Sequence, residues 1–291
     1  MARITAENGD YGRGLTLSAA ASSDERETEM ATQSASTVPQ LGELLRYWRQ
    51  ERGKSQLDLS LDTGISQRHL SFVESGRSAP SRDFLSIVSD ALNIPLRERN
   101  VLLLVSGFAP QYSEQSMDAE QMAVVTQAID RMLHQHEPHP ALVLDRYWNV
   151  IRTNEAAPRF FGSFVDLDKR PKPRNLLDLM FDPAGMRPFV EDWEKVAAGL
   201  LQRVRREAVG QVVDVELAKL LKRMREYPGV AELRPPLAPQ SPVLPIVFRR
   251  GTQRLSYFSL ITTVGTPQCI TAQELRVECM YPIDVEEGKA L

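Results

Sequence analysis

Ser55 to Pro80 reads S-Q-L-D-L-S-L-D-T-G-I-S-Q-R-H-L-S-F-V-E-S-G-R-S-A-P, and we interpret the rest of the chain outward from it. The pattern predicts two short helices joined by a tight turn, because Gly64 follows one amphipathic run and Ser66 precedes the next. Ser55 and Ser66 are placed to cap the amino ends of the two helices. Asp58 completes an acidic variant of a capping box at the first of them.

The second helix of this pair has an apolar face and a polar face. Leu70 and Val73, together with Leu59 of the first helix, fall on a shared inner side. The outer face carries four side chains at positions i, i+1, i+4 and i+5, namely Gln67, Arg68, Ser71 and Phe72. These groups suit the major groove of DNA, where base edges present donors, acceptors and thymine methyl groups. Two capped helices with a glycine turn also occur in many other helical proteins.

Further helices are predicted on both sides of this pair. The preceding helix ends at Gly53 and carries an apolar stripe of Leu41, Leu44, Leu45 and Trp48. A following helix runs from about Arg82 to Asn93 with Ser81 as its cap, and Pro95 opens a fifth helix that ends at Gly107.

With these motifs in place, residues 41–107 resemble the five-helix DNA-binding domain of the XRE family, the lambda-type phage repressor fold. The resemblance is carried by L-R-x-x-R, Q-x-x-L-S, G-I-S, H-L-S-F-V-E-S-G-R and P-S, in that order. It implies double-stranded DNA as partner, with Gln56 at a phosphate and Gln67, Arg68 and Phe72 at base edges. Many members have a polar residue where Phe72 stands, so Phe72 either contacts thymine or packs.

Charge is nearly balanced in this region, since residues 39–110 carry nine basic and eight acidic side chains. Phosphate contacts must therefore come from local charge, and we expect them from His69, Arg77 and Arg82, in addition to the Gln56 contact that the resemblance implies. A small domain that makes few such contacts binds one half-site weakly. We therefore expect a homodimer on an operator that is an inverted repeat.

The remaining composition indicates a cytoplasmic protein of about two domains without a cofactor. The 291 residues are 42% hydrophobic, with no apolar run of membrane-spanning length and no secretory leader. Cys269 and Cys279 match no metal or redox spacing. His134, His136 and His139 straddle a predicted helix end, which favours surface or capping roles over a metal site.

Five segments are expected along the chain. Residues 1–38 read as a disordered extension, with Met30 as an alternative start, and residues 39–108 as the helix-turn-helix domain. Residues 109–117 form a linker, residues 118–282 an effector domain and residues 283–291 a flexible tail.

The period of the pattern changes from helix to strand at Ala141. A helix from Asp118 to about Gln135 precedes a β-hairpin formed by A-L-V-L and W-N-V-I-R-T, after which Asn154 caps a short helix. The later elements are expected at Asn175–Phe181, Pro188–Ala208 and Asp214–Tyr227 as helices, an extended loop at Pro228–Pro245, and strands at Ile246–Arg250, Arg254–Val264 and Glu274–Tyr281.

This order predicts an α+β, PAS-like fold with an antiparallel sheet. Residues 118–282 resemble the ligand-binding domain of MmyB-like regulators, through A-L-V-L-D-R-Y-W-N-V-I-R-T-N-E-A-A, L-L-D-L-M-F-D-P and L-S-Y-F-S-L-I-T-T-V. The resemblance implies a small apolar effector, acyl-chain-like or fatty acid-like.

We expect the effector pocket on the strands and short helices that flank the sheet. The expected lining is Trp148, Phe161, Met180, Phe181, Phe258 and Leu260, with Arg152 as an anchor for a carboxylate. Alternatively, the aromatic side chains interdigitate without a void and Arg152 pairs with a surface acid.

Catalytic motifs such as G-x-S-x-G, H-E-x-x-H and the P-loop are missing from the sequence, so we do not expect an enzyme. The prediction is a sequence-specific DNA-binding transcription regulator with an effector-binding domain. Its rival is a DNA-binding protein whose C-terminal domain serves protein interaction or dimerisation. A weaker rival is an enzyme fused to a DNA-binding domain.

Overall fold

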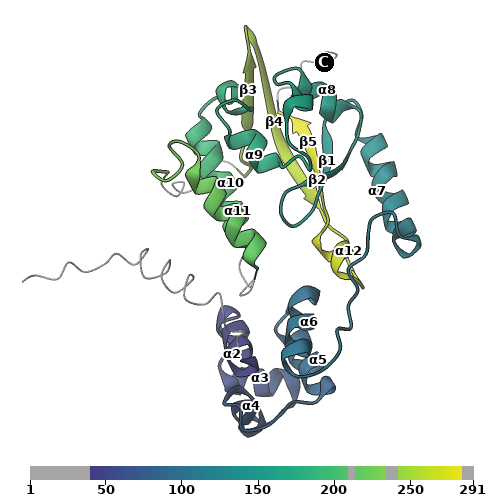
Figure 1. The fold of residues 1–291 in the computed structure, drawn as a ribbon, viewed down its shortest axis with the longest axis vertical. Coiled ribbons are helices and arrows are strands. Elements are labelled where there is room, and N and C mark those ends of the chain that lie inside the picture. The colour runs from purple at the N-terminus through teal and green to yellow at the C-terminus, as the bar shows by residue number, and fades with distance from the viewer. Residues whose placement is uncertain (1–39, 209–213, 234–241, 284–291) are drawn as a thin grey trace, which may run out of the picture. The chain divides into compact units, whose positions relative to one another are not determined.

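Five helices follow one another in the first part of the computed structural model, which describes residues 40–208, 214–233 and 242–283 (Figure 1). They are α2 (Leu41–Glu51), α3 (Gln56–Thr63), α4 (Gln67–Glu74), α5 (Arg82–Ala91) and α6 (Leu96–Val105), and together they are called the helical part below. The expected disordered extension, the alternative start at Met30 and residues 284–291 of the expected tail lie outside the described residues.

The turn between α3 and α4 forms as its sequence predicts. Ser55 Oγ accepts a hydrogen bond from Asp58 N (3.1 Å), and the Asp58 carboxylate accepts one from Ser55 N (2.8 Å). Ser66 Oγ accepts one from His69 N (3.2 Å). Gly64 has a φ of 71°, in the left-handed region that favours glycine. The capping box, the αL residue and the second cap therefore fix α4 relative to α3.

All five helices contribute to one apolar core. It contains the predicted stripe of α2, the inner residues of α3 and α4, and Leu102 and Leu103 of α6. Leu59, Leu70 and Val73 are each at most 2% exposed, which confirms the predicted inner side. Leu102 and Leu103 of α6 therefore lie in the same core as Leu70 and Val73 of α4.

The second part of the chain, called the α+β part, contains a five-stranded antiparallel sheet in the order β2-β1-β5-β4-β3. Its elements are α7 (Ala123–Gln135), β1 (Ala141–Leu144), β2 (Val150–Thr153), α8 (Ala156–Gly162), α9 (Leu176–Phe181), α10 (Trp193–Ala208), α11 (Val215–Glu226), β3 (Ile246–Arg250), β4 (Gln253–Thr262), α12 (Ile270–Glu274) and β5 (Arg276–Pro282), with one-turn 3-10 helices at Glu120–Met122, Leu167–Lys169 and Arg187–Phe189.

Helices cover both faces of this sheet (Figure 1). Successive side chains of a strand point to opposite faces. On one face, Tyr257 of β4 and Met280 of β5 join a large core with side chains of α8 to α11. On the other face, Cys279 of β5 packs with Ile129 and Leu133 of α7. The hairpin, helical insert and closing strands were all predicted in this order.

Several element boundaries differ from the prediction, and the three that change the local structure most are the starts of α7, α10 and β5. Asp118 does not cap α7, which begins at Ala123 after a 3-10 turn. Helix α10 begins at Trp193 and not at Pro188, because the chain first makes a 3-10 turn and Val190 then pairs with Phe248 of β3. Residues Ile270 to Glu274 form the short helix α12, so β5 begins at Arg276.

Much of the expected loop from Pro228 to Pro245 lies outside the described residues. Within the described ranges, none of the helices has the length and apolar character needed to cross a bilayer.

Candidate DNA interface and effector region

The outer face of α4 is open to solvent. Gln67 and Arg68 are exposed, and Ser71 and Phe72 are half-buried. Leu70 and Val73, on the opposite face, are 2% and 1% exposed. The structure therefore brings the four expected base-contacting side chains together on one accessible helix face, as the spacing predicts.

Phe72 lies between two arginines on this face. The guanidinium carbon of Arg68 is 5.2 Å from the centroid of the Phe72 ring, and that of Arg77 is 6.0 Å away. Cation–π contacts of this kind orient a guanidinium while leaving its N–H groups available. Phe72 thus packs against Arg68 and Arg77, and because its side chain is only half-buried, the contact with thymine stays a prediction.

The four expected phosphate-contacting residues differ in their surroundings. Arg77 and Arg82 are exposed, and the Arg82 guanidinium lies 5.0 Å from the Phe108 ring. His69 is half-buried against the edge of Phe84 (5.1 Å between centroids). Gln56 Nε2 donates to Glu74 Oε2 (2.9 Å). An amide nitrogen carries two hydrogens, so Gln56 keeps a second donor.

The helical part and the α+β part match two different protein families. A helix-turn-helix family model matches residues 45–99, which contain α4 and its exposed face. The model of the MmyB-like transcription regulator ligand binding domain matches residues 125–291, more than half of the chain. The chain belongs to this family. It is a DNA-binding transcription regulator with a ligand-binding domain. None of the curated proteins matches the chain.

The residues expected to line an effector pocket of this MmyB-like regulator fall on both faces of the sheet. Four of them lie together in the large core that α8 to α11 share with the sheet, each at most 5% exposed: Trp148, Phe161 of α8, and Met180 and Phe181 of α9. Phe258 and Leu260 face the other way, because they pair with Tyr281 and Cys279 on the α7 side. Phe258 stacks on Tyr281, and Leu260 is 50% exposed. The six residues therefore cannot line one cavity.

Arg152 also lies on the α7 side of the sheet. Its guanidinium pairs with Asp118 (2.8 Å) and Asp130 (3.4 Å), both of which are exposed. This is the ion pairing that the sequence offered as the alternative to a carboxylate anchor. Arg152 is separated by the sheet from the apolar core that contains Trp148.

Two hollows open on the surface of the α+β part. One of about 650 Å³ is lined by residues around Arg187 and Trp193, and one of about 730 Å³ by residues around Phe164 and Arg174. Neither is lined by any of the seven residues expected at the pocket. The core around Phe160 is filled by edge-to-face rings, including Phe161, Phe248 and Tyr257.

The histidines beyond α7 serve local contacts. His136 Nε2 lies 2.9 Å from Met280 O, and its ring meets Tyr281 edge-on. Burial, with a contribution from the charge on His136, lowers the pKa of His139. Among the residues that the structure describes, no three His, Cys, Asp or Glu side chains are grouped as metal ligands would be.

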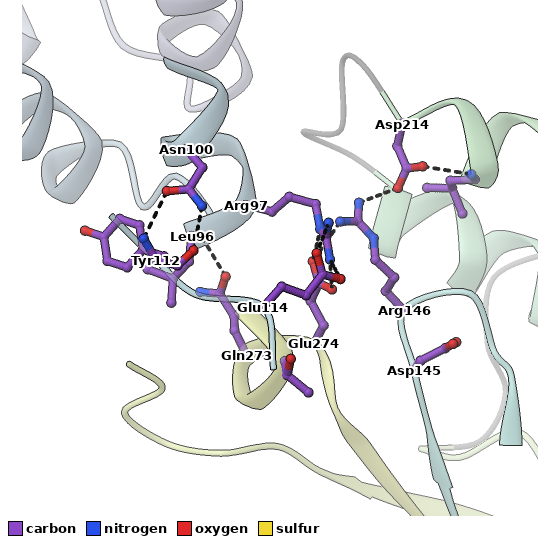
Figure 2. Close-up of polar contacts among 12 residues, drawn as sticks. Leu96, Arg97, Asn100, Tyr112, Glu114, Asp145, Arg146, Asp214, Gln273 and Glu274 are labelled. Atoms are coloured by element: carbon purple, nitrogen blue, oxygen red, sulfur yellow. Dashed lines mark hydrogen bonds and ion pairs between the residues drawn. The ribbon is translucent and has the colours of Figure 1, made fainter. Parts of the chain in front are cut away.

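A cluster of charged side chains joins the helical part to the α+β part, and the sequence reasoning did not identify it (Figure 2). Its members are Arg97 and Glu98 of α6, Glu114, Arg146 of the β1–β2 turn, Asp214 at the start of α11, and Glu274 of α12. Arg97 and Glu274 are 177 residues apart, so a local pattern carries no signal for their contact.

Proposed function

We propose that this regulator reads an operator through the outer face of α4 and acts as a homodimer on an inverted repeat, without catalytic activity. The observation that supports this most is the accessible row of Gln67, Arg68, Ser71 and Phe72 above a fully buried inner face. Exposed Arg77 and Arg82 flank the row and supply charge for phosphates.

The test of the DNA interface begins with sequencing the genomic DNA that the purified protein retains. With that operator, Arg68→Ala is expected to lower specific affinity by about 1–3 kcal/mol and to relax discrimination at one base pair, measured by fluorescence anisotropy at fixed salt. Gln56→Ala is expected to weaken all sequences about equally. Arg131→Ala, which removes an exposed arginine of α7, is the control. Unchanged affinity and base preference in Arg68→Ala would show that another surface reads the DNA.

We further propose that the effector is a small apolar molecule with an acyl chain, bound in the core that contains Trp148, Phe161, Met180 and Phe181. The apolar character of this cluster and the match to a ligand-binding domain support the proposal. Because rings fill this region, binding requires the side chains to move apart, and flexible Met180 is suited to such repacking.

Dodecanoate tests this proposal by thermal unfolding. At a hundredfold excess over Kd, a ligand that binds only the folded chain raises the melting temperature by roughly 5–10 °C. Ala157→Leu adds bulk to the same core and is expected to weaken the response, whereas Leu260→Trp changes the opposite face of the sheet and is expected to retain it. If acyl compounds leave the wild-type melting temperature unchanged, the filled core favours the rival function, a protein-interaction or dimerisation module.

A further inference from the structure

Helix α12 is a five-residue helix within the connection between β4 and β5, and it contacts the helical part and the segment that follows it. Ile270 N donates to Ser113 O (2.9 Å), and Thr271 Oγ1 donates to Gln115 O (2.6 Å) while accepting from Gln115 N (2.9 Å). Gln273 Oε1 accepts a hydrogen bond from Leu96 N (2.7 Å), at the first residue of α6. Residues that join two central strands therefore also hold the start of α6.

The contact with Leu96 serves as an amino-terminal cap. The first amides of a helix have no acceptor within the helix. Pro95 occupies the N-cap position of α6 and provides no side-chain acceptor. Gln273 supplies the missing acceptor from the α+β part, so the first turn of α6 depends on the position of α12 (Figure 2).

The neighbouring residues form a two-bond ion pair. Arg97 Nε lies 2.8 Å from Glu274 Oε1, and Arg97 Nη2 lies 2.9 Å from Glu274 Oε2. Parallel bonds from a guanidinium to a carboxylate fix orientation as well as distance. The pKa of Arg97 is raised by Glu274 and further by Glu114, which keeps the pair charged. Below, the α6–α12 contact means Leu96, Arg97, Gln273 and Glu274.

The carboxylate of Glu274 is shared with the β1–β2 turn. Arg146 Nη1 donates to Glu274 Oε1 (2.7 Å), and Arg146 Nη2 pairs with Asp214 (2.5 Å), the N-cap of α11. The side chains of Arg146 and Asp214 are only 4% and 7% exposed. The α6–α12 contact is thus tied to the turn and to the start of α11.

The same turn reaches the apolar core of the α+β part. Trp148, two residues after Arg146, is 1% exposed, and the guanidinium of Arg203 on α10 lies 4.2 Å from the centroid of its ring. Asp145 holds the turn by accepting from Tyr147 N (2.8 Å) and Asn149 N (2.9 Å). A displacement of Trp148 would therefore move Arg146, and with it the carboxylate that holds Arg97.

We propose that the α6–α12 contact transmits the state of the effector core to the DNA-reading helices, through Trp148, Arg146, Glu274 and Arg97 in turn. This inference rests on the proposed function, because it assigns the regulation of that effector site. The later turns of α6 lie in the core that contains Leu70 and Val73 of α4, and in this proposal that core carries a change at the first turn of α6 to the reading face.

The experiment measures hydrogen exchange of the full-length protein with and without operator DNA. Coupling between two binding sites is reciprocal, so a contact that carries a signal from the core to α4 also carries one back. In the wild type, operator binding is expected to change exchange rates at least threefold in α12 and in the turn at residues 145–149. Arg97→Ala and Glu274→Gln are expected to abolish the change in the turn, and the double variant to lose no more than either single one.

Two further variants separate transmission from simple attachment. Arg99→Ala removes an arginine of the same helix whose hydrogen bonds go to Asp90, Ile94, Ser89 and Tyr112 and not to α12, and it is expected to retain the exchange change. Arg97→Lys keeps the charge but not the two parallel bonds. It replaces Arg97→Ala in the exchange measurement if Arg97→Ala fails to fold, and it is also expected to lose the change in the turn. A change in the turn that survives in both Arg97 variants, or that is missing in the wild type, would overturn the proposal.

A second arm distinguishes this proposal from the proposed effector. If dodecanoate stabilises the wild type and alters operator affinity, the Arg97 variants are expected to keep the stabilisation and to lose the effect on affinity. If dodecanoate has no effect on the wild type, the proposed effector class fails, while the operator-induced exchange still decides the role of the contact.

Discussion

Glu74 is a buried carboxylate at the carboxyl end of α4 that connects three helices. It accepts hydrogen bonds from Arg49 of α2 (2.7 and 3.0 Å) and from Gln56 of α3 (2.9 Å). Burial alone would raise the pKa of its carboxyl, but these bonds and the guanidinium charges of Arg49 and Arg46 hold it below the ordinary 4.5. Its contribution to stability is therefore complete above pH 4.5 and is lost as the pH falls through the lower folded value.

We expect Glu74→Ala to reduce the free energy of unfolding by about 1–3 kcal/mol at pH 7, because it leaves the half-buried Arg49 guanidinium without its carboxylate and removes the acceptor of Gln56. Urea titration followed by circular dichroism measures the loss. Glu51→Ala removes an exposed glutamate of α2 and should change stability by less than about 0.5 kcal/mol. Equal effects in the two variants would contradict a structural role for Glu74.

The pKa of Glu98 on α6 is shifted in the opposite direction from that of Glu74. Burial raises its pKa to about 7, Asp214 and Glu274 add to the increase, and Arg146 and Arg97 oppose it. Because the folded-state pKa of Glu98 lies above its unfolded value of 4.5, the contribution of Glu98 to stability is most favourable below pH 4.5 and becomes unfavourable as the pH rises towards 7. The fall amounts to about 3 kcal/mol, because a difference of one in pKa corresponds to about 1.4 kcal/mol.

We expect Glu98→Gln to remove this fall and to raise the unfolding free energy at pH 8 relative to the wild type. Urea titrations at intervals from pH 4.5 to 8 measure it, with Glu120→Gln as an exposed control. A wild-type profile and a Glu98→Gln profile that run parallel across this range would show that Glu98 ionises without cost.

At the scale of elements, Gly42 determines how closely α2 approaches α4. A Cβ atom on Gly42 would lie 2.2 Å from the Glu74 carbonyl oxygen, which is backbone and cannot rotate away. Gly42→Ala is therefore expected to destabilise the protein by about 1–3 kcal/mol and to weaken operator binding by displacing α4.

Gly162→Ala in α8 is the control. The added methyl group would meet its nearest atom, a leucine methyl, at 3.8 Å, so this variant should be neutral or stabilising. Thermal unfolding of both variants provides the comparison.

The elements also show why the sequence predicted the helix caps of the helical part better than the side-chain directions in the sheet of the α+β part. The caps of α3 and α4 depend on Ser55, Asp58, Gly64 and Ser66, which are close in the chain, and all of them formed as predicted. The face occupied by a strand residue depends on pairing with distant strands, and Phe258, expected to line one pocket with Trp148, lies on the opposite face of the sheet. Local sequence fixes caps and spacing, whereas register and long-range ion pairs depend on the whole fold.

At the scale of the molecule, the described residues between Gln40 and Ile283 form one compact unit. The helical part and the α+β part therefore belong to the same unit, and the cluster around Glu274 is a contact between them. Residues 39–110 are close to neutral overall, so the available positive charge for DNA is concentrated near α4 in Arg68, Arg77 and Arg82. One such surface neutralises few phosphates, which is the physical reason to expect two copies on one operator.

We expect the regulator to bind as a dimer whose half-sites are centred about 10 bp apart, or a multiple of it. If Arg77 and Arg82 each neutralise one phosphate per half-site, the logarithm of the binding constant falls with the logarithm of salt with a slope of about −4 for the dimer and about −2 for a single half-site. Footprinting, solution mass and a salt titration measure these quantities together. Arg82→Ala should make the dimer slope shallower by about 2, whereas Arg131→Ala on α7 should leave it unchanged. A monomer mass with protection of a single half-site would contradict the dimer. Tight binding by one copy would then require DNA contacts beyond the exposed face of α4.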